Sequence, residues 1–73
     1  MIKVLLLAYR MAPGFGVSVV VDAVAKSLRQ QVTVEIAAFD IEGQWHCPIH
    51  RIAPTPIAVR MLANELAVTH VVA

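Results

Sequence analysis

The sequence has little charge and a single cysteine. Only 15% of its 73 residues are charged, and six Lys and Arg against five Asp and Glu leave a net charge of +1. A chain so evenly balanced has no electrostatic footprint for binding nucleic acid or an anionic lipid surface. The one cysteine, Cys47, excludes a disulfide framework within a single chain.

Long hydrophobic runs are missing too, although 59% of the residues are apolar. No stretch reaches the about 18 uninterrupted apolar residues that a membrane-spanning helix needs. The apolar run near the amino terminus stops at Tyr9 and Arg10, too early for the core of a signal peptide. High hydrophobicity with low net charge also excludes intrinsic disorder. We therefore expect a folded, cytoplasmic chain without a transmembrane segment.

The chain is short for a domain. Folded domains typically hold about 100–150 residues, and a smaller one leaves much of its surface in water. Such a surface should be polar, whereas this composition suits the interior of something larger. We therefore expect residues 1–73 to form a single partial domain. Either a missing C-terminal domain or assembly into a homo-oligomer would complete it.

The first half of the chain predicts a strand, a helix and a strand. Residues 2–9 form a nearly continuous apolar run, typical of a strand buried on both faces, and residues 10–16 form a loop. Residues 17–31 change to a helical period, and residues 32–40 alternate as a second strand. The helix positions expected to be buried are Val17, Val20, Val21, Val24 and Leu28, and those expected to be exposed are Ser18, Asp22, Lys26 and Arg29.

The second half predicts a strand, a helix and a strand after a loop at residues 41–48. Residues 49–53 fit a short strand, and residues 68–72 fit a last one. Between them, Thr55 and Pro56 mark the start of a helix, with Thr55 as its N-cap. The stripe expected to be buried is Val59, Leu62, Ala63 and Leu66, while Arg60 and Asn64 face outward.

The order of these elements, β-α-β-β-α-β, predicts the α/β fold class. We expect a Rossmann-like layered fragment with a mainly parallel sheet. The connection at residues 41–48 contains no helix and is short for a parallel crossover. The two strands that it joins are therefore either parallel or antiparallel.

The strongest candidate site is the loop that holds Gly14, Phe15 and Gly16, between the first strand and the first helix. In doubly wound folds ligands bind at this corner, because glycines let the backbone approach a phosphate and the helix start offers unpaired N–H groups. We predict these three residues as substrate-binding; the alternative is a simple turn. A dinucleotide fingerprint is incomplete, since Val19 replaces its third glycine, and no Gly-Lys-Ser/Thr of a P-loop occurs.

A second cluster holds His46, Cys47 and His50. Imidazole and thiolate groups suit zinc, but this spacing matches no standard zinc module. We therefore predict a loop with a buried cysteine and surface histidines, and no metal site. Arg51 and Arg60 could bind a phosphate, although a solvated role is more common for arginine. We predict no catalytic residue, because no carboxylate pair and no nucleophile with a base can be identified.

Four segments of the first half share a pattern with a known family. They are an apolar strand after Lys3, the loop Ala12-Pro13-Gly14-Phe15-Gly16, the helix segment Val24-Ala25-Lys26-Ser27-Leu28 and the strand Val32-Thr33-Val34-Glu35-Ile36. Together they resemble the start of the group 1 glycosyltransferases of GT-B fold. The remainder resembles the family more loosely, through His50-Arg51-Ile52 and the helix at Pro56. The chain departs from the family at Gln30-Gln31, where Gly-His is common.

The resemblance implies a retaining enzyme that transfers a sugar from a nucleotide-diphosphate donor to an acceptor. It implies that this chain is the first part of the acceptor-side domain and that the 73 residues alone are inactive. The nucleotide sugar is then a substrate, no cofactor is required, and the donor and acceptor are partners only of an intact enzyme. Two alternatives stay open: a self-associating α/β binding module without chemistry, and a dinucleotide-binding half-domain.

Overall fold

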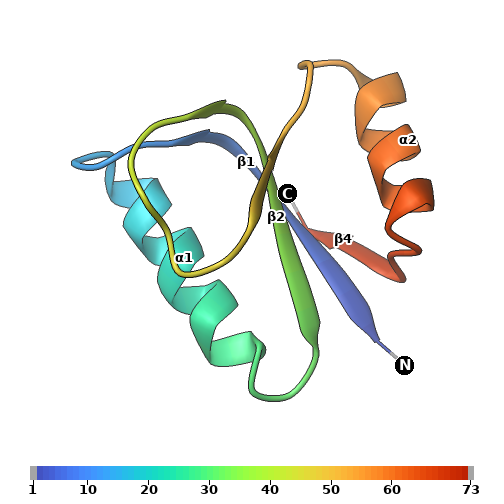
Figure 1. The fold of residues 1–73 in the computed structure, drawn as a ribbon, viewed down its shortest axis with the longest axis horizontal. Helices are drawn as coiled ribbons and strands as arrows, with labels where there is room; N and C mark the ends of the chain where they lie inside the picture. Colours follow the sequence, from blue (N-terminus) through green and yellow to red (C-terminus); the bar gives the residue numbers. More distant parts are fainter. Residues whose placement is uncertain (1, 73) are drawn as a thin grey trace.

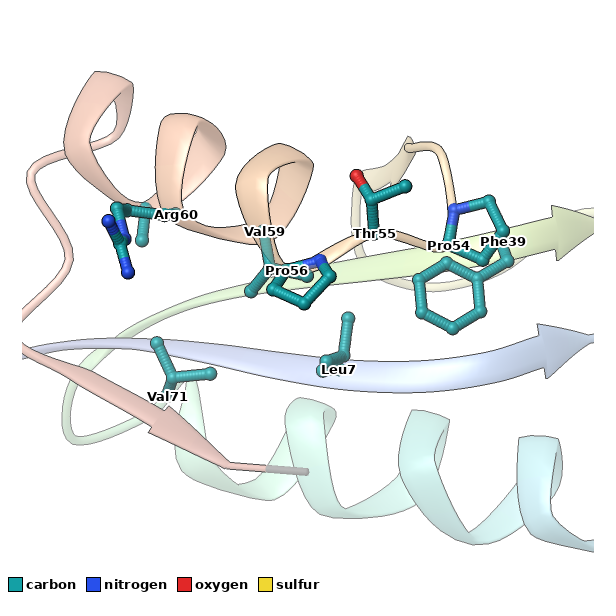
Figure 2. A pocket seen from close by; sticks show the side chains of 9 residues that line it. Leu7, Phe39, Pro54, Thr55, Pro56, Val59, Arg60 and Val71 are labelled. Atoms are coloured by element: carbon teal, nitrogen blue, oxygen red, sulfur yellow. The ribbon is translucent and has the colours of Figure 1, made fainter.

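The computed structural model describes residues 2–72, which form a four-stranded, all-parallel sheet with one helix on each face (Figures 1 and 2). Along the chain the elements are β1 (Lys3–Met11), α1 (Gly16–Leu28), β2 (Thr33–Ile41), β3 (Ile49–Arg51), α2 (Pro56–Glu65) and β4 (His70–Val72). The strands lie side by side in the order β3-β2-β1-β4. The predicted α/β class and order of elements are confirmed. Strands β2 and β3, whose relative direction the sequence left open, are parallel.

Strands β1 and β2 form the centre of the sheet. β1 and β2 pair along their whole length, from Lys3 beside Thr33 to Met11 beside Ile41. Strand β1 is longer than predicted: residues 10 and 11, expected in the loop, continue the ladder, and Met11 is completely buried. The main core lies between the sheet and α1. Its buried members are Leu6, Ala8, Met11, Ala25, Val34, Ile36, Ala38 and Cys47.

Helix α1 turns a different face to the sheet from the one predicted. Val17, Val20 and Val24, expected in the core, are 58%, 61% and 44% exposed. The buried residues of α1 are instead Ser18, Asp22 and Ala25, while Val21 and Leu28 of the predicted stripe do pack against the core. The prediction was wrong because polar side chains are tolerated inside when they satisfy backbone groups there. Ser18 and Asp22 both do so.

Helix α2 starts as predicted. The Thr55 hydroxyl accepts a hydrogen bond from the Ala58 N–H at 3.2 Å, and Pro56 is the first helical residue. The predicted stripe of α2 is only half-buried, and no residue of this helix is fully buried. At the other end Ala67 adopts a left-handed backbone with φ 55°. Strand β4 begins at His70, two residues later than predicted.

Within residues 2–72, no helix combines the length and the apolar character needed to cross a membrane.

Candidate functional site

The strand order reverses beside β1. From β1 the chain crosses to β2 through α1 on one face, and from β3 it crosses to β4 through α2 on the other face (Figure 2). The neighbours β1 and β4 therefore flank a topological switch point, and ligands of open α/β sheets bind outside the carboxyl ends of the strands at such a point. The carboxyl end of β1 leads directly into the loop of Gly14, Phe15 and Gly16, blue at the left of Figure 1.

This glycine loop, residues 12–16, is a tight turn in which every residue except Ala12 is exposed. The Phe15 N–H donates to the Ala12 carbonyl at 3.1 Å, and Gly14 has φ 81°, a conformation that favours glycine. A Cβ atom added at Gly14 or at Gly16 would meet nothing within 4 Å. The backbone of both glycines is therefore open to an approaching ligand. The structure places all three predicted site residues together in this loop.

The start of α1 has unpaired amide groups. Its N-cap, Phe15, makes no side-chain capping hydrogen bond, and the first turn contains no acidic residue. In a helix the first N–H groups have no partner inside the helix, and they add to the positive end of its dipole. The N–H groups of Gly16 and Val17 are thus available to an anion beside the glycine loop.

Ser18 fixes the glycine loop to β1. Its hydroxyl oxygen accepts a hydrogen bond from the Ala12 N–H at 3.0 Å, and the hydroxyl donates to the Arg10 carbonyl at 2.9 Å. The Ser18 side chain is completely buried. Sequence reasoning missed this role. The available signal was a serine in the first turn of a helix, directly after a glycine loop.

A network of ion pairs lies at the carboxyl ends of β1, β2 and β3. Asp40 is 3.3 Å from Arg10 Nε and 3.1 Å from the Arg51 guanidinium, and Glu42 is 3.2 Å from Arg10. Two cations thus face two carboxylates, so the network adds no net charge to this edge. Each of these side chains is more than two-fifths exposed, so each pair contributes little stability. Arg51, considered above for phosphate binding, is engaged here.

The loop between β2 and β3 is tied to α1 and to the residue that follows it. Both carboxylate oxygens of Asp22 hold His46, one at 3.1 Å from its N–H and the other at 2.6 Å from its ring Nδ1. Arg29 donates to the His46 carbonyl at 3.0 Å, next to Cys47, which is buried in the core. In the part of the chain that the structure describes, no three potential metal ligands come together.

His50 belongs to a different group, across three strands. Glu35 lies in the middle, 2.7 Å from His50 Nε2 and 3.2 Å from Lys3 Nζ. Burial raises the pKa of the Glu35 carboxyl, but hydrogen bonds and charge from His50 and Lys3 outweigh it and hold this pKa below its usual value. This group lies toward the amino ends of β1 and β2, away from the glycine loop.

Comparison with known protein families, with curated proteins and with solved structures finds no match to this chain. The candidate site therefore rests on its own geometry.

Proposed function

We propose that this chain forms the first part of the acceptor-side domain of a retaining glycosyltransferase, and that its glycine loop faces the diphosphate of the nucleotide-sugar donor. The observation that supports the proposal is the position of Gly14 and Gly16 beside an uncapped helix start, at the switch point of an all-parallel sheet. The resemblance of residues 1–39 to the start of such enzymes agrees with it.

The chemistry of the loop suits a diphosphate better than a catalytic step. The N–H groups of Gly16 and Val17 can donate to phosphate oxygens, and the positive end of the α1 dipole stabilises their charge. The glycine loop itself carries no acid, base or nucleophile. In this proposal the chain positions the donor, while bond cleavage depends on groups outside it, so the 73 residues alone are inactive.

Thermal protection of the chain tests the proposal. Uridine diphosphate, guanosine diphosphate and their nucleotide sugars should raise the melting temperature, because a ligand that binds only the folded state stabilises it. Gly16→Val places a branched side chain over the amides and should abolish the protection. Ala23→Val places the same side chain at an exposed position of α1 and should keep the protection.

Three outcomes would contradict the proposal. One is no protection by any diphosphate, and another is equal protection of the Gly16→Val variant. The third is protection by a nicotinamide dinucleotide alone, which would favour the dinucleotide-binding half-domain instead.

A second candidate function is self-association without chemistry, favoured by the exposed valines of α1. Val20 and Val24 line a hollow of about 170 Å³ together with Leu6 and Val72, and monomeric proteins rarely expose contiguous apolar patches of large area. Native mass spectrometry should then detect a homodimer that Val20→Lys dissociates and that Lys26→Glu, a change at another exposed position of α1, leaves intact. A monomer at all concentrations would contradict it.

A further inference from the structure

A hollow of about 620 Å³ separates α2 from the sheet, on the face opposite α1 (Figure 2). We call it the α2 hollow. Leu7, Phe39 and Val71 of the sheet line one side, and Val59 and Ala63 of α2 line the other. Because α2 buries none of its residues completely, the hollow is not filled by the core. Its volume lies within the about 300–1,000 Å³ typical of small-molecule sites.

The α2 hollow is elongated along the helix. Its lining includes both Pro56, at the start of α2, and Ala63, which the rise per residue of an α-helix places about 10 Å apart. Arg60 lies at one end, and Phe39 lies with Pro54 at the other (Figure 2). The Phe39 ring is held by Tyr9 in an edge-to-face contact, with ring centroids 5.7 Å apart. The Phe39 end of the hollow is therefore apolar, and the Phe39 ring packs against a second aromatic ring.

Charge is confined to the other end. Arg60 is the one charged residue among those that line the α2 hollow, and the Thr55 hydroxyl is already used to cap the helix. No carboxylate within residues 2–72 forms an ion pair with Arg60, in contrast to Arg10 and Arg51. The hollow is thus apolar along most of its length. At one end lies the guanidinium of Arg60, which has no carboxylate partner within residues 2–72.

We propose that the α2 hollow binds an anionic amphiphile, with its acyl or alkyl tail between α2 and the sheet and its oxyanion head at Arg60. The head group is a carboxylate or a phosphate, since the guanidinium binds both through paired N–H donors. The tail leaves water for a surface formed by Leu7, Val59 and Val71, which the hydrophobic effect favours. This site is independent of the proposed function, because it lies between α2 and the sheet and shares no residue with the glycine loop.

Methyl and amide NMR spectra of the chain, titrated with single-tailed probes, test the site. Octanoate and octyl phosphate distinguish the two head groups, while octylamine carries the same tail with a cation. Both anions should shift the signals of Val59, Ala63 and Val71, which line only this hollow, and octylamine should bind about tenfold more weakly or not at all. Whichever of octanoate and octyl phosphate binds with the higher affinity identifies the head group that the hollow prefers.

Two variants separate the contribution of the head group to binding from that of the tail. Arg60→Gln should weaken octanoate by about tenfold and remove the preference for anions over octylamine. Ala63→Phe should fill the hollow and abolish binding of all probes. Lys26→Gln removes a cation from an exposed position of α1 and should leave the binding of all probes unchanged.

Four results would overturn the proposal. The first is equal binding of octylamine and octanoate, and the second is unchanged octanoate binding in Arg60→Gln. The third is a set of shifts confined to Val17, Val20 and Val24, which would mean generic adsorption to the exposed valines. The fourth is shifts of Val59 and Val71 that depend on protein concentration without any probe, which would mean that a second copy occupies the hollow.

Discussion

The buried hydroxyl of Ser18 bridges the strand and the loop that precede it, accepting a hydrogen bond from the Ala12 N–H at 3.0 Å. It also donates to the Arg10 carbonyl at 2.9 Å. One side chain therefore satisfies two backbone groups where β1 ends and the glycine loop begins. Because the N–H groups proposed to bind a diphosphate, those of Gly16 and Val17, lie where this loop ends and α1 begins, their position depends on Ser18.

Replacing Ser18 should destabilise the protein. Ser18→Ala leaves a buried N–H and a carbonyl without their partner, which costs about 1–3 kcal/mol in the free energy of unfolding. Urea denaturation measures this loss. Ser27→Ala, at an exposed position of the same helix, is the matched control and should change stability by less than about 0.5 kcal/mol. Equal stability of the two variants would contradict the role assigned to Ser18.

Replacing Asp22 should release the loop between β2 and β3. In Asp22→Ala the His46 N–H and ring lose the carboxylate that holds them at 3.1 Å and 2.6 Å. We expect a loss of about 1–3 kcal/mol and faster hydrogen exchange at the His46 amide. The Ala58 amide, bonded to Thr55 on the opposite face, serves as the internal reference. Unchanged exchange at His46 would show that Asp22 does not hold the loop.

Glu35 should make the free energy of unfolding depend on pH. Its pKa is lowered in the folded state, so the unfolded chain binds the proton more readily. The stabilisation is therefore complete above the unfolded pKa of about 4.3 and is lost as the pH falls through the folded pKa. Glu35→Gln should flatten this part of the stability profile, measured by urea denaturation between neutral and strongly acidic pH. A profile of the same shape in the variant would assign the acid dependence to other carboxylates.

Ala67 is a position where glycine should improve the fold. Its φ of 55° lies in the left-handed region, just after the end of α2, where glycine has no Cβ penalty. Ala67→Gly should raise the free energy of unfolding by about 0.5–1 kcal/mol. Ala58→Gly, inside α2, should lower it by about 1 kcal/mol. Destabilisation by both changes would contradict the left-handed conformation of Ala67.

The sequence predicted the order of the elements, because apolar runs, helical periods and turn residues are local signals. Thr55 before Pro56 is such a signal, and its capping hydrogen bond is confirmed. The buried face of α1 was not predictable in the same way. Hydropathy assigns Val20 to the core and Ser18 to the surface, but their burial depends on partners elsewhere in the fold. Asp22, for example, is buried against a loop residue 24 positions along the chain.

In the candidate site, too, the features set by local sequence were predictable and those set by the tertiary fold were not. The glycine loop was predictable, since Gly14 and Gly16 mark a turn between a strand and a helix. The engagement of Arg51 with Asp40, and the lack of a carboxylate partner for Arg60 within the described residues, were not predictable. They depend on which strands become neighbours, and on how far α2 stands from the sheet.

An amide NMR titration with a nucleoside diphosphate is the first measurement to make, because it shows residue by residue whether the glycine loop binds an anion. The largest shifts should fall on the N–H groups of Gly14, Gly16 and Val17, and Gly16→Val should remove them. Shifts elsewhere, or none at concentrations that saturate ordinary nucleotide sites, would contradict the proposal that this loop binds an anion.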